Sequence, residues 1–344
     1  MFVGRFPNFT TCYLELVKLV SKNHQYESAP RGQKIRECLG VSFTIENPRD
    51  RMLFAKGRKF SPVYLAAELL WYLSGNDKTA WISKYSNFWS GISDDGKTAN
   101  SAYGARLFQP HERISDGNLN QWEFVVNELT KDPDSRRAVM HLRVPEDSVK
   151  AKLDVPCTLA LQFLIRNGAL HQIVHMRSSD VILGIAYDIP AFTLFQEIMA
   201  NELGVELGTY THVSNSLHIY ERHFEMASEI LSPANLSSSL SWSRNGGECA
   251  PICNLSLAEI RAQIIVPMMR DEEALWQATE RWSVLSALNC GFTLNTAITT
   301  NTMWEDMLKL LAIRRLRVLG HKTAAEQLRK NLDYRGYTFF DGRK

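Results

Sequence analysis

Residues 155–180, VPCTLALQFLIRNGALHQIVHMRSSD, decide how this chain folds. The runs 159–165 and 170–176 are rich in Leu, Ile, Phe and Val, which predicts two β-strands. Between them, Asn167 and Gly168 form the two-residue signal of a type I′ hairpin. The strands should therefore pair antiparallel and bring Cys157 and Arg177 to the same edge of a sheet.

The chain after the hairpin predicts a helix and a further strand. Segment 189–204, IPAFTLFQEIMANELG, has Pro190 in its first turn and Gly204 as its stop. Segment 211–220, THVSNSLHIY, is strand-like. One compact unit thus gathers a thiol, an arginine, two aspartates, a histidine and a tyrosine: Cys157, Arg177, Asp180, Asp188, His218 and Tyr220.

The order of these groups carries more information than any one of them. A single cysteine is usually a small buried hydrophobe, and an arginine near an aspartate is usually a surface pair. The ordered set PC, Gln162, RSSD, Asp188, Asn215 and HIY resembles the signature of the thymidylate synthase family over roughly residues 10–230. This resemblance implies an α/β fold in three layers, with helices on a mixed sheet and a homodimer through the sheet face. We expect a catalytic domain over 1–231 and a C-terminal extension of a loop and helices over 232–344.

Composition agrees with a large enzyme and excludes several other classes. The 344 residues include 45% hydrophobic ones, enough for a sizeable core, and a formal net charge of +2 favours neither nucleic acid nor a membrane as partner. There is no bilayer-length apolar run and no secretory signal, so we expect a cytoplasmic protein; the resemblance adds a phage-encoded enzyme in host cytoplasm as one setting. Six cysteines without framework spacing indicate reduced thiols, and we expect no metal site.

Two helices are clear in the N-terminal half. Residues 10–21 have apolar residues at helical spacing. In 61–75, Ser61 is the expected N-cap, Pro62 the first helical residue and Gly75 the stop. Glu68 lies one turn from Tyr64 and from Tyr72, and burial there would raise its pKa toward values suited to handling protons. The resemblance implies that Glu68 organises water and protons around a pyrimidine.

Several positions are similar to phage deoxycytidylate hydroxymethylases rather than to synthases. They are the NSxYG motif that ends with Tyr103 and Gly104, Thr158 directly after the cysteine, Asn215, and the RHF that follows HIY. Asn100, Ser101 and Thr158 are more polar than the synthase residues, which predicts a wetter pocket.

The chemistry follows from a thiolate beside an arginine. Addition of Cys157 to C6 of a pyrimidine would make C5 nucleophilic toward a one-carbon unit, and Arg177 would lower the pKa of the thiol. The resemblance implies 5,10-methylenetetrahydrofolate as the donor, with Trp89 as a stacking wall and Asp180 on the pterin. It implies a catalytic part for Tyr103 besides Cys157, Glu68 and Asp188. It also implies nucleotide contacts from Arg31, Arg136, Arg137, Gln162, Arg177, Ser178, Asp188, His218 and Tyr220, with Arg136 and Arg137 reaching into the partner's site.

Asp188 sets the expected substrate. Synthases have asparagine there, and a carboxylate suits the amino group and N3 of cytosine better than uracil. We therefore predict conversion of dCMP to 5-hydroxymethyl-dCMP. Alternatives are a dCMP 5-methyltransferase, a CMP 5-hydroxymethylase, a thymidylate synthase, or an idle relative that binds nucleotide or RNA. Asp188 could also simply cap the helix expected to start at Pro190.

The C-terminal third predicts helices after a loop. Residues 232–248 are rich in Ser, Asn and Gly, which favours a loop and a boundary. Helices are expected over 271–285, 303–320 and 323–332, the last with Thr323 and Glu326 at capping-box spacing.

Overall fold

The fold is built on one mixed β-sheet. The computed structural model describes all residues except 1–2, 110–119, 150–151, 286–301, 335 and 337–344. The eight-stranded sheet has the order β1-β3-β8-β6-β5-β4, with β2 paired to β3 and β7 to β8. The strands are β1 Val3–Phe6, β2 Tyr26–Ser28, β3 Ile35–Ile45, β4 Val139–His141, β5 Thr158–Arg166, β6 Ala169–Met176, β7 Ser179–Asp180 and β8 Glu206–Tyr220. Because β6 runs parallel to β8 but antiparallel to β5, the sheet is mixed, as predicted.

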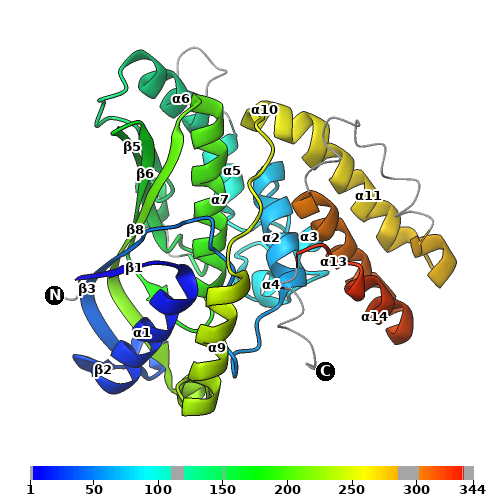
Figure 1. The fold of residues 1–344 in the computed structure, drawn as a ribbon, viewed down its shortest axis with the longest axis horizontal. Helices are drawn as coiled ribbons and strands as arrows, with labels where there is room; N and C mark the ends of the chain where they lie inside the picture. Colours follow the sequence, from blue (N-terminus) through cyan, green and yellow to red (C-terminus); the bar gives the residue numbers. More distant parts are fainter. Residues whose placement is uncertain (1–2, 110–119, 150–151, 286–301, 335, 337–344) are drawn as a thin grey trace.

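Helices form two layers against one face of this sheet (Figure 1). Helices α1 and α7 pack directly on the strands, and α13 and α11 pack on α2 from farther out. The helices are α1 Phe9–Lys22, α2 Pro62–Ser74, α3 Thr79–Ile82, α4 Phe88–Ile92, α5 Tyr103–Phe108, α6 Gln121–Lys131, α7 Ile185–Leu203, α8 Phe224–Ile230, α9 Pro233–Gly246, α10 Leu257–Ile260, α11 Val266–Gln277, α13 Thr302–Val318 and α14 Lys322–Lys330. A π-helical stretch, η4, covers Arg261–Ile265. We call α10, η4, α11 and α13 the outer helices.

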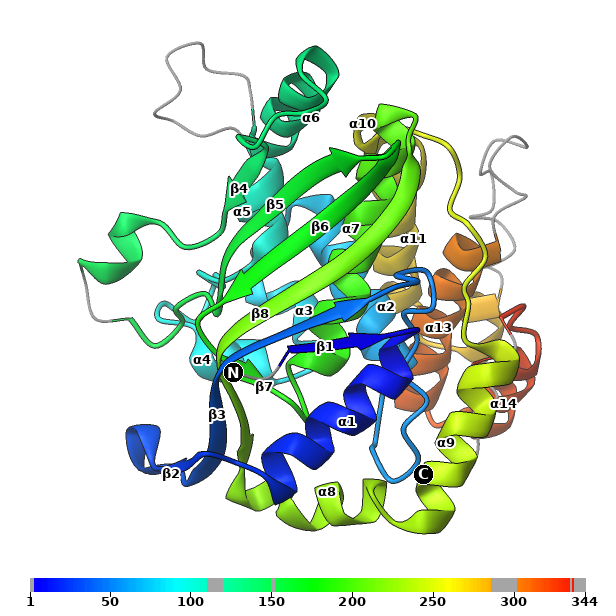
Figure 2. The same cartoon turned by 60° about the vertical axis from the view of Figure 1, so that its left-hand side comes forward.

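The other face of the sheet has no described helix over it (Figure 2). Side chains on this face, such as Thr44, Leu164, Ile173 and Val213, are half-buried, whereas their neighbours along the strands point into the helical layer and are buried. Alternation of this kind follows from the two-residue repeat of a β-strand. The uncovered face is therefore available for contact with another molecule.

The hairpin forms as predicted. Asn167 and Gly168 have φ values of 52° and 76°, the left-handed pair that a type I′ turn needs. At the open end of the hairpin, the Arg177 amide donates to the Cys157 carbonyl at 2.9 Å. The strand register therefore brings the thiol and the arginine together.

Helix α2 also begins and ends where the sequence predicts. The Ser61 hydroxyl accepts from the Tyr64 amide, Pro62 is the first helical residue, and Gly75 ends the helix with φ 70°. Side chains on both of its faces are buried, because α2 lies between the inner layer and the outer helices.

The prediction that a helix starts at Pro190 is wrong. Helix α7 begins at Ile185, and Pro190 lies inside it. The missing amide of a proline is tolerated near a helix start, and the Asp180 carboxylate holds the preceding turn by accepting from the amides of Ile182 and Leu183. Asp188 is therefore inside the first turns of α7 and does not cap it; Gly184 is the N-cap.

The prediction of a loop over 232–248 is wrong as well. Helix α9 occupies Pro233–Gly246 and packs against α1. Its buried Ser239 donates its hydroxyl to the Asn235 carbonyl one turn back and accepts from the Lys56 amide. Small serines thus permit close packing that outweighs their weak helix propensity.

Two smaller points concern the C-terminal part. Helix α14 starts at Lys322 with no side-chain cap, so the capping box expected at Thr323 and Glu326 is absent; Glu326 pairs with Arg329 instead. Cys290 lies outside the described residues. None of the described helices is long and apolar enough to cross a bilayer.

Candidate active site

Cys157 and Arg177 meet at the open end of the hairpin. The Arg177 guanidinium donates to the carbonyls of Pro156 and Val155 at 3.0 and 2.8 Å, and its Nη2 lies 3.6 Å from Cys157 Sγ. Burial nevertheless raises the pKa of the thiol, and Arg177 only opposes that rise. Arg177 therefore lowers the pKa of the thiol as predicted, but burial outweighs this effect in the chain alone.

Glu68 projects from α2 into a tyrosine-lined site. Its Oε1 accepts from the hydroxyls of Tyr64 at 2.7 Å and Tyr72 at 3.3 Å. The Trp89 indole donates to the Tyr64 hydroxyl at 3.0 Å, so Trp89 on α4 belongs to the same chain of hydrogen bonds. Burial raises the pKa of the Glu68 carboxyl to about 7, although both tyrosines lower it. Glu68 can therefore gain and lose a proton near neutral pH.

Tyr103 is pressed against α2 because its neighbour is a glycine. A Cβ at Gly104 would come within 1.8 Å of the Tyr72 carbonyl, so only glycine lets α5 approach this closely. The Tyr103 ring stacks on Tyr72 at 5.3 Å. Burial raises the pKa of the Tyr103 phenol well above its usual value, Asp188 and Cys157 add to the rise, and the Thr158 hydroxyl lowers it. The four side chains therefore share one small region.

The Thr158 hydroxyl is the least satisfied polar group there. Thr158 is fully buried, and its Oγ1 lies close enough to Tyr103 to lower the pKa of that phenol but meets no described residue with good hydrogen-bond geometry. A buried hydroxyl without a partner costs free energy unless a water or a ligand binds it. Thr158 thus marks a place for a polar ligand atom beside the nucleophile.

Asp188 lies in the same region. Asp188 is half-buried and lies close enough to Cys157 to raise the pKa of that thiol. Burial raises the pKa of this carboxyl well above its usual value, and the nearby carboxyls of Glu68 and Asp180 raise it further. In the chain without ligand, these surroundings favour the protonated form of Asp188, which can both donate and accept.

A network of polar residues that the sequence did not indicate holds the nucleophile loop. Buried Asp154 accepts from the Ser101 amide at 2.8 Å and from the Ser101 hydroxyl. The Asn100 amide donates to the Asp154 carbonyl and to Asp147, both at 2.9 Å, and Asn100 Oδ1 accepts from Lys152. The polar groups of Asn100 and Ser101 therefore bind this loop, and the wetter pocket expected from them stays a prediction.

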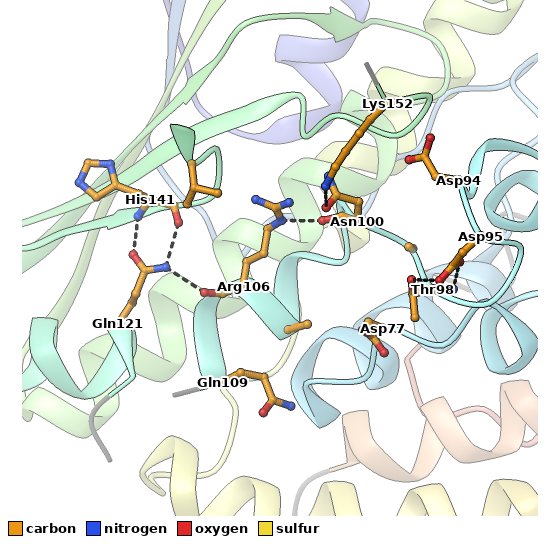
Figure 3. Close-up of a pocket in the computed structure, with 13 residues that line it drawn as sticks. Asp77, Asp94, Asp95, Thr98, Asn100, Arg106, Gln109, Gln121, His141 and Lys152 are labelled. Atoms are coloured by element: carbon orange, nitrogen blue, oxygen red, sulfur yellow. Dashed lines mark hydrogen bonds between the residues drawn. The ribbon is translucent and has the colours of Figure 1, made fainter. Parts of the chain in front are cut away.

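Arg106 completes this network beside a cavity of about 510 Å³ (Figure 3). Arg106 forms a bidentate pair with Asp147 at 2.8 Å and donates to the Asn100 carbonyl. Aspartates 77, 94 and 95 line the cavity at the other end (Figure 3). Cys157, Glu68 and Asp188 are not among the described residues that line it, so this cavity lies behind the nucleophile loop.

The expected sugar and pterin contacts lie along β7 and β8. His218 and Tyr220 share one face of β8, with their rings 5.0 Å apart. Asp180 pairs with His218 in the parallel register of β7 and β8. Ser178 is half-buried between Arg177 and β7. These four residues flank the end of the hairpin that carries Cys157 and Arg177.

Three other arginines and Gln162 are placed differently. Arg31 is exposed in a tight turn with φ 54°, yet it is close enough to lower the pKa of the Cys157 thiol. Arg136 and Arg137 are exposed, and Arg137 pairs with Glu128 of its own chain at 2.9 Å. Gln162 lies on the uncovered face of the sheet and donates to the Arg136 carbonyl at 3.0 Å. The chain alone does not bring Arg136, Arg137 and Gln162 to Cys157.

Comparison with known proteins places this arrangement in a family. The family model described as thymidylate synthase matches residues 11–246. The chain belongs to the thymidylate synthase family. A deoxyuridylate hydroxymethyltransferase of Bacillus phage SP01 is 35% identical over 220 residues, which cover 61% of this chain and 57% of the relative. The aligned region thus spans little more than half of that relative. The resemblance that the ordered motifs indicated is therefore confirmed at the level of the family.

Proposed function

We propose that this protein is a hydroxymethyltransferase that converts dCMP to 5-hydroxymethyl-dCMP. The observation that carries the proposal is a carboxyl, Asp188, which lies close enough to Cys157 to raise the pKa of that thiol. The family match, which includes both residues, supports the pyrimidine nucleotide as substrate. The cytoplasmic setting expected from composition is part of this proposal.

The nucleophile acts after the nucleotide binds. The substrate phosphate would meet Arg177 and Arg31, and the base would displace water from the pocket. Cys157 then adds as a thiolate to C6 of the pyrimidine, and C5 attacks the one-carbon unit. Because burial raises the pKa of Cys157, the thiol must lose its proton in the complex, with Arg177 favouring the anion.

Asp188 would read the base as a neutral acid. Its O–H can donate to N3 of cytosine while its carbonyl oxygen accepts from the amino group. Passing the proton to N3 would draw charge out of the ring and make C6 easier for Cys157 to attack. The raised pKa of Asp188 favours the protonated form that this transfer needs.

Product choice turns on what reaches the exocyclic methylene group. In the C6 adduct, loss of the C5 proton and release of tetrahydrofolate would leave this methylene. A water oxygen can then add to it and lose a proton, and the electron pair that returns to the ring expels the Cys157 thiolate as the C6–S bond breaks, which yields the hydroxymethyl group. The buried Thr158 hydroxyl supports a water at this place, because among the described residues only the Tyr103 phenol is near it and no hydrogen bond of good geometry is formed. Glu68, with a pKa of about 7, is suited to take the proton.

The residues fit methylenetetrahydrofolate as donor. The donor supplies the one-carbon unit in an electrophilic state. Trp89 is buried and fixed by its bond to Tyr64, and the preceding residue, Phe88, exposes 58% of its surface. Leu183, close to Asp180 in the chain, exposes 43%. An exposed apolar surface beside a polar group suits a flat ring with hydrogen-bonding edges.

A homodimer would complete the site. Arg136 and Arg137 are exposed just before β4, and the Arg136 carbonyl accepts from Gln162 on the uncovered face of the sheet. Pairing through that face would let them reach the partner's phosphate. Mixing Cys157→Ala and Arg137→Ala subunits should then restore one working site per heterodimer, and verified heterodimers without activity would contradict shared sites.

The direct test is product identification. The protein should be incubated with labelled methylenetetrahydrofolate and, separately, dCMP, CMP and dUMP, followed by mass analysis. We expect a gain of one hydroxymethyl group on dCMP and release of tetrahydrofolate. A methylated product with dihydrofolate, or no reaction with any nucleotide, would refute the proposal.

A second candidate is hydroxymethylation of dUMP. The phage SP01 relative is named for that substrate. A neutral Asp188 could accept from N3–H and donate to O4 of uracil, so the charge repulsion expected from the sequence disappears when the acid is protonated. Preference for dUMP in the same assay would select this candidate.

A further inference from the structure

The outer helices contact the catalytic layer through a buried ion pair. Glu272 of α11 is fully buried, and both of its oxygens lie 3.1 Å from the Lys84 ammonium. Glu272 Oε1 also accepts from the Tyr85 hydroxyl at 2.8 Å, and the Trp276 indole donates to that hydroxyl at 3.0 Å. The Lys84 carbonyl accepts from Arg314 of α13 at 3.3 Å. Helices α11 and α13 therefore both contact residues 84–85.

Residues 84–85 lie immediately before the wall that holds Trp89. They connect α3 to α4, and Trp89 donates to Tyr64, which donates to Glu68. A shift of this segment would move the Trp89 indole and break its hydrogen bond to the Tyr64 hydroxyl. That hydroxyl in turn donates to the Glu68 carboxyl. The position of Glu272 thus affects the position of Glu68 through the connecting segment and the hydrogen bonds of Trp89 and Tyr64.

Arg261 of η4 makes a second contact of the same kind. Its guanidinium donates to the Ser74 carbonyl at 3.1 Å and to the Phe108 carbonyl at 3.4 Å. These carbonyls end α2 and α5, the helices that carry Glu68 and Tyr103. A cation at two helix C-termini satisfies their open carbonyls and favours the dipoles.

We infer that the outer helices fix the geometry of the catalytic pocket, with Glu272 and Arg261 as positioning residues for Trp89, Glu68 and Tyr103. Neither residue touches the reacting atoms. This assigns a task to the C-terminal third, beyond the nucleotide chemistry. Its kinetic consequence rests on the proposed function, whereas its structural consequence does not.

The experiment compares Glu272→Gln with Glu273→Gln in the full chain. Glu273 is the exposed neighbour on the same helix and serves as the matched control. Hydrogen exchange should be followed over residues 79–92 and, as a reference, over the hairpin 158–176. Loss of a charged hydrogen bond should speed exchange over 79–92 by roughly tenfold to a hundredfold, with little change in the hairpin.

The kinetic readout separates positioning from general damage. Glu272→Gln should raise the KM for methylenetetrahydrofolate by about tenfold while the nucleotide Kd stays unchanged, because only the wall with Trp89 is loosened. Arg261→Gln provides a second variant if Glu272→Gln folds poorly. It should lower kcat through Glu68 and Tyr103, and Arg261→Lys should recover part of that loss, with exposed Arg270→Gln as control.

Each outcome has one meaning. Exchange over 79–92 equal to that of the Glu273→Gln control would overturn the inference. Faster exchange with unchanged kinetic constants would also overturn it, because the contact would then be structural only. Faster exchange in a protein whose wild type transfers no one-carbon unit would refute the proposed function and leave the coupling between the outer helices and residues 79–92 in place.

Discussion

The candidate pocket has two walls that are built in different ways. The sheet wall consists of β5, β6 and β8 and carries Cys157, Arg177 and His218. The helix wall consists of α2, α4 and α5 and carries Glu68, Trp89 and Tyr103. Hairpin register alone joins Cys157 to Arg177, whereas the helix wall is held by Arg261 and Glu272 from far along the chain.

The sheet wall therefore supplies the reactive group, and the helix wall sets the geometry around it. On the sheet wall, Cys157 and Arg177 are neighbours because they lie at the paired ends of β5 and β6. This arrangement tolerates substitutions elsewhere in the protein. On the helix wall, a buried carboxyl is held between tyrosines at a free-energy cost, and packing by the outer helices must offset it. We therefore expect changes on the sheet wall to remove a chemical step and changes on the helix wall to alter its protonation, selectivity and stability.

The largest effect should come from the nucleophile. Cys157→Ala should lower turnover by at least about 10⁴-fold, because no other group can form the C6 bond. Nucleotide binding measured by calorimetry should change little, since Arg177 remains. Substantial turnover by the alanine variant would show that the sheet wall is not the reactive one.

The next effect concerns the buried acid of the helix wall. The folded protein keeps the Glu68 proton up to a pKa of about 7, whereas the usual value is 4.5, so stability falls as pH rises between these values. Relative to Glu68→Gln, the wild type should lose about 3 kcal/mol of unfolding free energy over that window. Urea titrations at pH 4.5 and 7.5 measure it, and equal pH dependence in both proteins would contradict a buried, strained Glu68.

A smaller effect is expected at the base. Asp188→Asn should shift the ratio of kcat/KM for dCMP over dUMP toward dUMP by about tenfold to a hundredfold, because an amide cannot pass a proton to N3. Competition between the two nucleotides in one reaction gives the ratio directly. An unchanged ratio would mean that Asp188 does not read the base.

The smallest effect concerns the water. Thr158→Val keeps the shape of the side chain and removes the hydroxyl, so the fraction of hydroxymethyl product should drop by about tenfold relative to methyl product. Thr158→Ser is the matched control that keeps the hydroxyl. Dihydrofolate absorbance and nucleotide mass report the two outcomes, and identical product ratios in all three proteins would exclude Thr158 as the water site.

The sequence predicted local features well and distant contacts poorly. Caps at Ser61 and Gly75 and the Asn167-Gly168 turn are short-range signals, and all are present in the structure. Their success placed Glu68 between its tyrosines and Cys157 beside Arg177. The start of α7 was misplaced because Pro190 is tolerated inside it, and α9 was missed because its serines are stabilised by packing against α1.

Site residues that depend on tertiary contacts had no signal in the sequence. Asp154 is an ordinary loop aspartate until Ser101 is folded against it, and Glu272 is one of several acidic residues on α11. The direction of the Cys157 pKa shift was also missed, because burial depends on the whole fold and outweighs the adjacent arginine. Pairing of Arg137 with Glu128 likewise follows from the packing of α6 beside β4.

The ion pair between Lys84 and Glu272 has a consequence for biosynthesis. Its two partners are 188 residues apart in the chain. At roughly 5–20 residues per second, a ribosome adds Glu272 roughly 10–40 seconds after Lys84. During that interval the sheet wall can already form its hairpin, while the apolar outer side of α2 has no cover. The nascent chain therefore passes through a stage in which the loop with Cys157 has formed and the apolar outer side of α2 is still exposed. At that stage a ribosome-associated chaperone would be needed most.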